Sequence, residues 1–229
     1  MNQKLELTET VRLFEALGLF DMNGHVSLRV KDGFLTHGRQ AGRSTLTVND
    51  IIKVGLDGVK LEGTQEPPNE VYLHSEIYSA REDVFAIAHF HGHWNNILSV
   101  AGVPFAPICT VACGLGAQIP VYPDLDSISS RDRGREVAQY LGENSTLILR
   151  AHGVIVTGNS LKEVLVASKF LEMNAERQVY VHMLNPAAKL SNDEIERIGK
   201  ALWIPKNIEK TWLYYYEKAK REGKFQGIS

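Results

Sequence analysis

The sequence is poor in cysteine and in signals for export. Its 229 residues include two cysteines, which are too few for a disulfide framework. Cys109 and Cys113 have the spacing of half a metal site, but the chain offers no second pair, so we interpret both as small buried residues. The first residues lack a basic segment followed by a continuous apolar run, and we therefore expect a cytoplasmic protein.

Excess charge and long apolar runs are missing as well. Lys and Arg number 25 against 27 Asp and Glu, a net charge of -2, which is too balanced for the phosphate-neutralising field of a nucleic-acid-binding protein. No stretch approaches the roughly 18 apolar residues that a membrane-spanning helix needs. We expect neither nucleic acid nor membrane as a partner. The 44% hydrophobic content suffices for a full core, and we expect residues 1–229 to form a single domain.

Helical and strand-like patterns alternate along the chain. Apolar residues at helical spacing, capping boxes at Ser160 and Glu163 and at Ser191 and Glu194, and period-two alternation define the elements. Several predicted strands follow one another through short turns, which favours an α/β fold with a mixed or antiparallel central sheet over strict βαβ winding. The predicted helices are 7–17, 69–81, 94–102, 126–142, 161–184 and two C-terminal segments. The predicted strands are 25–30, 34–38, 84–91 and 146–158, with a further strand after a short turn or helix start within 46–58.

Three histidines stand at alternate positions in 89-HFHGHW-94. Side chains two apart on a strand share a face, so His89 and His91 project together if 84–91 is a strand. Neutral imidazole is the commonest nitrogen ligand of metals, and a catalytic zinc typically takes three protein ligands and keeps one open position. His152 is the candidate third ligand, because it ends the apolar run LILRAH and precedes a glycine. We interpret His93, beyond Gly92, as a residue that lines the pocket.

A carboxylate and another histidine precede this motif in 70-EVYLH-74. Glu70 and His74 are four residues apart and share one face of a predicted helix. A carboxylate beside a metal can coordinate it or carry protons. A glutamate at a helix start is also favourable to the helix dipole when it is solvated, and local sequence alone favours this simpler reading.

Taken in order, these motifs resemble those of the class II aldolase/adducin family. The matching segments are 24-GHVSLR-29, 70-EVYLHSEIYSAREDVFAIAHFH-91 and 149-LRAHGVIVTGNSLKEVLVASKFLE-172, within a match that runs from about residue 8 to residue 185. The resemblance implies a three-layer α/β/α fold and a homotetramer with active sites at subunit interfaces. It also implies one divalent ion per subunit, held by His89, His91 and His152, and histidine ligands admit zinc, manganese, cobalt or iron. Glu70 matches the acid/base of the family, whose chemistry passes through a metal-stabilised enolate or enediolate.

The sequence departs from the sugar-phosphate aldolases of that family where they hold phosphate. It has His25 in place of an asparagine, the loop 36-THGRQAG-42, and 67-PPN-69 before the glutamate, where a serine pair is expected. Of the hydroxyl groups in such a cradle, Ser27 and Thr36 remain. Arginine forks suit planar carboxylates. The substrate-binding candidates are His25, Ser27, His37, Arg39 and Arg43.

A carboxylate substrate without phosphate is typical of the decarboxylase branch of the family. Our first hypothesis is a metal-dependent lyase that decarboxylates a hydroxylated aromatic or heteroaromatic mono- or dicarboxylate, with Glu70 or a histidine protonating the ring carbon. The alternative is an aldolase acting on a short sugar, a sugar phosphate or a keto acid. A non-catalytic adducin-like binding module is the third hypothesis, and the retained histidines and glutamate oppose it. Tyr214, Tyr215 and Tyr216 fall where family members often use a tyrosine from a neighbouring subunit as proton donor.

Overall fold

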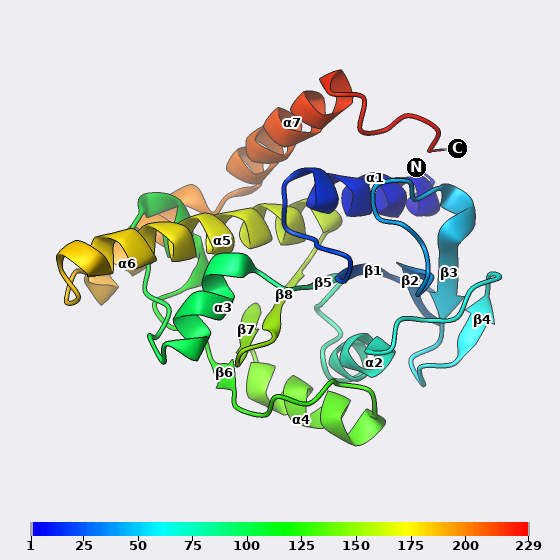
Figure 1. The fold of residues 1–229 in the computed structure, drawn as a ribbon, viewed down its shortest axis with the longest axis horizontal. Helices are drawn as coiled ribbons and strands as arrows, with labels where there is room; N and C mark the ends of the chain where they lie inside the picture. Colours follow the sequence, from blue (N-terminus) through cyan, green and yellow to red (C-terminus); the bar gives the residue numbers. More distant parts are fainter. Residues whose placement is uncertain (1, 229) are drawn as a thin grey trace.

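A mixed eight-stranded sheet forms the centre of the molecule (Figure 1). The computed structural model describes residues 2–228. The strand order is β4-β3-β2-β1-β5-β8-β7-β6, and each neighbouring pair is antiparallel except β6 and β7. The predicted mixed, largely antiparallel sheet is confirmed. The strands are β1 (His25–Val30), β2 (Gly33–His37), β3 (Ile51–Val54), β4 (Lys60–Glu62), β5 (Ala86–Phe90), β6 (Val121–Tyr122), β7 (Thr146–Leu149) and β8 (Gly153–Gly158).

Helices cover both faces of this sheet, which confirms the three-layer α/β/α arrangement (Figure 1). One hydrophobic cluster joins α1, α5 and α7 to one face, and a second joins α2 and α4 to the other. Across residues 2–228, no helix is both long and apolar enough to cross a membrane. The helices are α1 (Gln3–Ala16), α2 (Val71–Ala80), α3 (His93–Val100), α4 (Arg131–Leu141), α5 (Leu161–Leu184), α6 (Asn192–Leu202) and α7 (Pro205–Arg221), with 3₁₀ turns at Val48–Asp50 and Thr110–Leu115.

The segment 146–158 is a hairpin, and the single strand that we predicted there is wrong. Strands β7 and β8 pair antiparallel around a tight turn at residues 150–152, so His152 lies in the turn. Ala151 in this turn has a φ of 55°, and its N–H donates to Ser99 Oγ at 2.9 Å. A positive φ is uncommon at a residue other than glycine. Residues 150–152 contain no glycine, and apolar residues lie on both sides of them, so the sequence pattern gave no signal for a turn.

The predicted helix 126–142 begins five residues later, at Arg131. Ser130 has an extended backbone, and its side chain accepts a hydrogen bond from the N–H of Arg133, which is the arrangement of an N-cap. The apolar spacing of 126–142 overlooked this cap. The residues before Ser130 are thereby released from the helix, and Ser127 and Ile128 take part in the site described next.

Candidate functional site

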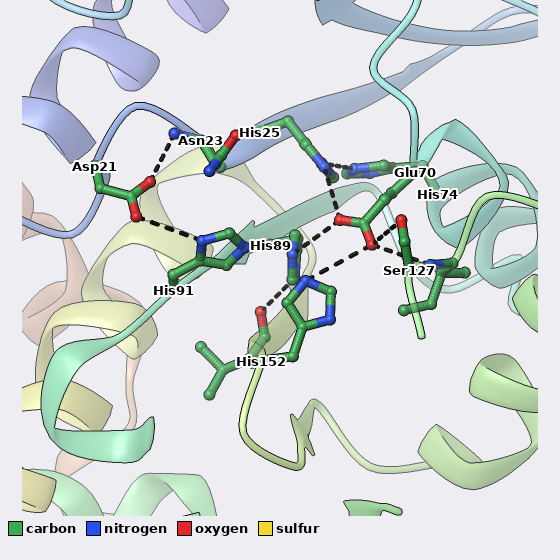
Figure 2. A network of polar contacts seen from close by, with 12 residues as sticks. Asp21, Asn23, His25, Glu70, His74, His89, His91, Ser127 and His152 are labelled. Atoms are coloured by element: carbon green, nitrogen blue, oxygen red, sulfur yellow. Dashed lines mark hydrogen bonds and ion pairs between the residues drawn. The ribbon is translucent and has the colours of Figure 1, made fainter. Parts of the chain in front are cut away.

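Three histidines from two parts of the sheet meet at one end of the central strands (Figure 2). His89 is on β5, His91 follows the end of β5, and His152 is in the turn between β7 and β8. The pairing of β5 with β8 brings this turn beside the end of β5. The ring centroids are 5.3 Å apart for His89 and His91, 5.0 Å for His89 and His152, and 5.1 Å for His91 and His152.

The chemistry of His89 fits a metal ligand. Its Nδ1 lies 3.1 Å from the carbonyl oxygen of Val154, and because a carbonyl only accepts, Nδ1 carries the proton. In the neutral ring that ligation requires, Nε2 presents a lone pair, and within the described chain this fully buried atom has no hydrogen-bond partner. A carboxylate oxygen of Glu70 lies 3.2 Å away. A lone pair facing an anion is unfavourable unless a cation lies between them. A ligating histidine also usually donates its other ring N–H to a carbonyl or carboxylate oxygen, as Nδ1 does here.

His91 and His152 place two further nitrogen donors beside His89. One ligand atom from each of His89, His91 and His152 lies within 4.8 Å of the others. Burial lowers the pKa of His152 to about 4, and burial together with the nearby His89 lowers the pKa of His91. Both rings are neutral near pH 7, as ligation of a divalent ion requires. The Nδ1 atom of His91 faces an oxygen of Asp21 at 3.4 Å, which leaves its Nε2 for the cluster.

Asp21 is expected to support metal binding through His91. Its carboxylate orients the ring and raises the basicity of Nε2, and loss of such a partner typically lowers metal affinity about 10- to 100-fold. The Asp21 side chain is half exposed, so we expect about a tenfold loss for Asp21→Asn. Competition with a chromophoric zinc chelator measures the affinity, and Asp193→Asn, an exposed aspartate on α6, is the control. Equal affinities of the two variants would contradict the role of Asp21.

Glu70 lies beside His89 and His152 (Figure 2). It precedes α2, and one carboxylate oxygen accepts hydrogen bonds from Ser127 Oγ and from the N–H of Ile128, both at 3.0 Å. The other oxygen is 3.8 Å from His25 Nε2. The side chain is buried, which contradicts the solvated reading of this glutamate. Burial, the largest single cause, raises the pKa of the carboxyl, but the neighbouring His25 and His89 together outweigh it and hold the pKa below its usual range. Glu70 is therefore a carboxylate at neutral pH.

A polar cavity of about 250 Å³ opens beside this cluster. The guanidinium of Arg43 donates to the carbonyl of Gly24 from two nitrogens, at 3.2 and 3.0 Å, and to the carbonyl of Ala41 at 2.5 Å. These bonds hold Arg43 in place and leave two of its five N–H donors free. Arg39 is exposed and bonds to the carbonyl of Pro67 at 3.1 Å. The lining comprises Asn23, Gly24, His25, Arg39, Arg43, Pro68, Asn69, Glu70, His91, Ser127 and His152.

Two of the predicted substrate-binding residues do not line this cavity. Ser27 is fully buried, and its hydroxyl bonds to His74 Nδ1 at 2.7 Å and to the hydroxyl of Tyr78 at 2.8 Å. His37 is also fully buried and donates from Nδ1 to the carbonyl of Gly38 at 3.0 Å. Both side chains support the walls behind the cavity. The substrate contacts of His25, Arg39 and Arg43 stay predictions.

Acid is expected to destabilise the fold through its buried histidines. Burial lowers the pKa of His25 to about 4 and that of His37 to about 3, whereas an unfolded histidine titrates near about 6.5. Between these values the unfolded chain binds more protons than the folded one. The free energy of unfolding therefore falls as the pH drops from about 6.5 towards about 4, by up to about 1.4 kcal/mol per pH unit for each histidine.

Urea unfolding of the metal-free protein at about pH 7 and about pH 5 measures this loss. His37→Gln is expected to reduce it, because glutamine does not titrate in this range. His182→Gln is the matched control, since His182 is partly exposed and lies near the end of α5. If the free energy of unfolding of His37→Gln fell between the two pH values as much as that of the unaltered protein, His37 would not be a source of the acid sensitivity.

Sequence reasoning missed Asp21 and Ser127 and undervalued His74. Asp21 precedes β1 in an exposed segment, and Ser127 was assigned to a helix. For Ser127 the available signal was the serine cap at residue 130. His93 is exposed and lines a neighbouring groove with His91 and His152.

The tyrosines of α7 divide into packed and exposed residues. Tyr215 contacts the sulfur of Met173, and Tyr216 donates to Glu9 at 2.8 Å. Tyr214 is 63% exposed. Tyr214 is therefore the most accessible of the three to another molecule.

Comparisons with known proteins place the sequence in a family. The sequence matches the family described as Class II Aldolase and Adducin N-terminal domain over residues 5–179. It is 28% identical over 170 residues to a 3,4-dihydroxyphthalate decarboxylase of Arthrobacter keyseri, with 68% of each chain covered. It is 26% identical over 196 residues to a 5-methylthioribulose-1-phosphate/5-deoxyribulose-1-phosphate aldolase of Rhodospirillum rubrum, with 84% of this chain and 87% of the relative covered.

Solved structures show the same fold. An L-fuculose 1-phosphate aldolase from Glaciozyma antarctica superposes with a TM-score of 0.84 at 21% identity, covering 96% of this chain and 89% of that one. An aldolase II superfamily protein from Pseudomonas syringae has the same TM-score of 0.84 and the same identity of 21%, with 96% and 93% covered. At these identities the likeness establishes the architecture, and the chemistry must be argued from the site itself.

Proposed function

Because this chain belongs to the class II aldolase and adducin family, we propose that it is a divalent-metal-dependent lyase that decarboxylates a hydroxylated aromatic or heteroaromatic carboxylate. The observation that carries the proposal is the cavity, in which an arginine fork and a carboxylate stand beside the cluster of His89, His91 and His152. Two groups of the family's phosphate cradle are missing, because His25 stands in place of an amide and Ser27 does not line the cavity, although Asn23, Asn69 and Ser127 do. The 3,4-dihydroxyphthalate decarboxylase relative supports this choice.

Binding and orientation of the substrate fall to the arginines. The two free N–H donors of Arg43 suit a carboxylate oxygen pair or two separate oxygens. Three bonds to backbone carbonyls fix the guanidinium before substrate arrives, so little conformational freedom is lost on binding. Arg39 adds positive charge at the exposed rim. A ring carrying adjacent hydroxyl and carboxylate groups would thereby face the histidine cluster.

Proton transfer falls to Glu70. A divalent ion bound by His89, His91 and His152 would polarise the substrate oxygen next to the breaking bond and accommodate its negative charge. Glu70 is ionised at neutral pH, so it first accepts a proton, and the substrate hydroxyl supplies it. When the bond to the carboxylate carbon breaks, CO2 leaves and its electron pair stays with the ring. Glu70 then returns the proton to the ring carbon.

A second candidate, aldol cleavage of a short sugar, a sugar phosphate or a keto acid, has one specific observation in its favour. The aldolase relative from Rhodospirillum rubrum covers more of this chain, 84%, than the decarboxylase relative from Arthrobacter keyseri, 68%. The same histidines and Glu70 would serve this reaction, because it also leaves an electron pair on carbon beside a polarised oxygen. The two reactions differ in whether the leaving fragment is CO2 or an aldehyde.

We also propose that the protein acts in the cytoplasm as a homotetramer with its site at subunit interfaces. A groove of about 790 Å³ borders His91 and His152, and its lining includes the exposed apolar side chains of Ile97 and Val100. Val100 is 70% exposed. Apolar side chains exposed together in this way are typical of a protein interface. Sedimentation velocity tests the assembly, and a monomer at micromolar concentration would contradict it.

CO2 release from a panel of hydroxylated benzoates, phthalates and pyridine dicarboxylates tests the proposed function. The protein is loaded in parallel with zinc, manganese and cobalt, and each sample is also assayed for aldehyde release from ketose phosphates. Release of CO2 that needs the bound ion supports the decarboxylase. Aldehyde release with no CO2 favours the aldolase, and neither product with any ion favours the non-catalytic module.

A further inference from the structure

A chain of buried hydrogen bonds runs from the cavity into the core behind it. His25 Nδ1 lies 2.6 Å from His74 Nε2, and His74 Nδ1 lies 2.7 Å from Ser27 Oγ. Ser27 Oγ lies 2.8 Å from the hydroxyl of Tyr78. All four side chains are 5% exposed or less. The ring of Phe34 stacks on His74 and fixes its plane. His25 alone of the four lines the cavity, and Figure 2 shows its contact with His74.

The protons in this chain have one favoured direction. If Tyr78 donates to Ser27, then Ser27 donates to His74 Nδ1, His74 donates from Nε2 to His25, and the proton of His25 is on Nε2. In the reverse direction the Tyr78 hydroxyl has only the carbonyl of Phe85 to donate to, at 3.5 Å, and that carbonyl already accepts the N–H of Arg29 at 2.8 Å. The forward direction uses the shorter bond.

The carboxylate of Glu70 favours the same direction. His25 Nε2 lies 3.8 Å from Glu70 Oε2. In the forward direction an N–H points at this anion, whereas in the reverse direction a lone pair does. The distance is too long for a hydrogen bond, so the N–H of His25 remains free to bind a group that enters the cavity.

The chain of hydrogen bonds ends at Tyr78 and does not continue to solvent. Burial raises the pKa of this phenol, and its ring lies under the Arg29 guanidinium with 4.6 Å between them. The phenol therefore keeps its proton, and no proton passes along the chain to solvent. A buried chain of this kind orients its members instead of conducting.

We propose that Tyr78, Ser27 and His74 fix the tautomer of His25, so that His25 presents a neutral Nε2–H donor to an acceptor oxygen of the substrate. The three buried residues are positioning residues, and His25 is the one that contacts substrate. The inference rests on the proposed function only for the identity of the oxygen, a carboxylate or carbonyl. With Arg43 as the charged donor and His25 as the neutral one, the site discriminates between an acceptor and a donor group on the substrate.

The tautomer itself is measurable without any substrate. In zinc-loaded protein labelled with ¹⁵N-histidine, the protonated and unprotonated ring nitrogens have different chemical shifts, and the His25→Gln variant identifies the His25 signals by their loss. We expect the proton of His25 on Nε2. Ser27→Ala removes the link between Tyr78 and His74, and both tautomers of His25 are then expected. Tyr78→Phe is expected to have a smaller effect, because Ser27 can still donate to His74.

The matched control is Ser168→Ala. Ser168 is equally buried, but its hydroxyl bonds only to the carbonyl of Val164 in its own helix, at 2.7 Å. A tautomer change in Ser27→Ala that is absent from Ser168→Ala supports the chain. A proton on Nδ1 of His25 in the unaltered protein, or an unchanged tautomer in Ser27→Ala, overturns the proposal.

Calorimetric binding of 2-hydroxybenzoate to the zinc-loaded protein tests the second half of the inference. Loss of the donor in His25→Leu is expected to weaken binding about tenfold, which corresponds to about 1.4 kcal/mol. His25→Gln, whose amide places an N–H near the position of Nε2, is expected to bind nearly as well as the unaltered protein. Equal weakening in both variants overturns the donor role. Absence of binding to the unaltered protein counts against the proposed substrate class. The tautomer measurement then tests by itself whether the hydrogen-bond chain orients His25.

Discussion

Replacing His89 with alanine is expected to abolish metal binding and to lower activity by about a thousandfold or more. His89 is fully buried, and its Nε2 faces the centre of the cluster. A bound ion typically supplies several kcal/mol of charge stabilisation in the transition state, and about 4 kcal/mol corresponds to about a thousandfold in rate. Metal content by inductively coupled plasma spectrometry and turnover on the substrate found in the CO2 panel measure the two losses.

His93→Ala is the matched control for this experiment. His93 belongs to the same HFHGHW segment but is exposed at the start of α3. It is expected to keep the metal and most of the activity. If His89→Ala retained stoichiometric metal, the assignment of the three histidines as a binding site would fail, whatever reaction the protein catalyses.

Replacing Glu70 with glutamine is expected to lower the turnover number about 100- to 10,000-fold while metal remains bound. This is the usual contribution of a positioned acid or base. The glutamine carbonyl can still accept the hydrogen bonds of Ser127 and Ile128, so the loop before α4 is expected to keep its place. The loss therefore isolates proton transfer. Comparison of turnover and metal content with those of the unaltered protein measures it.

Glu66→Gln is the control for Glu70→Gln. Glu66 precedes the same helix but is exposed and pairs with Lys60 on the surface. A surface pair of this kind contributes little, so this variant is expected to keep full activity. A turnover in Glu70→Gln within about threefold of the unaltered value would assign the proton transfer to another group, and the C-terminal Tyr214 would be the next residue to replace.

The sheet and the histidine motif were predictable because each depends on a short-range pattern. Period-two alternation placed His89 and His91 at the end of one strand, and the sheet confirms that strand. The order of the motifs along the chain predicted which distant histidine would join them. The histidines could be recognised because polar residues are rare on the buried faces of strands.

The partners of the histidines were harder to predict because their roles depend on tertiary contacts. Asp21 reaches His91 from an exposed segment before β1, and Ser127 reaches Glu70 from the segment before α4. Neither residue has a periodic neighbour that distinguishes it from ordinary surface residues. The turn at Ala151 was missed for a different reason, since its positive φ is held by the contact with Ser99 and not by its own residue type.

The ligand positions also tie metal supply to the survival of the chain. His89 and His152 are far apart in sequence, and only the pairing of β5 with β8 brings them together. An ion bound to both would act as a cross-link between β5 and the β7–β8 hairpin, absent from the unfolded chain. Binding to the folded state alone stabilises it by RT ln(1 + [L]/Kd), about 4 kcal/mol at a thousandfold excess over Kd. In a cell with too little metal, this protein would lose its resistance to proteolysis as well as its activity, and its abundance would depend on the metal concentration.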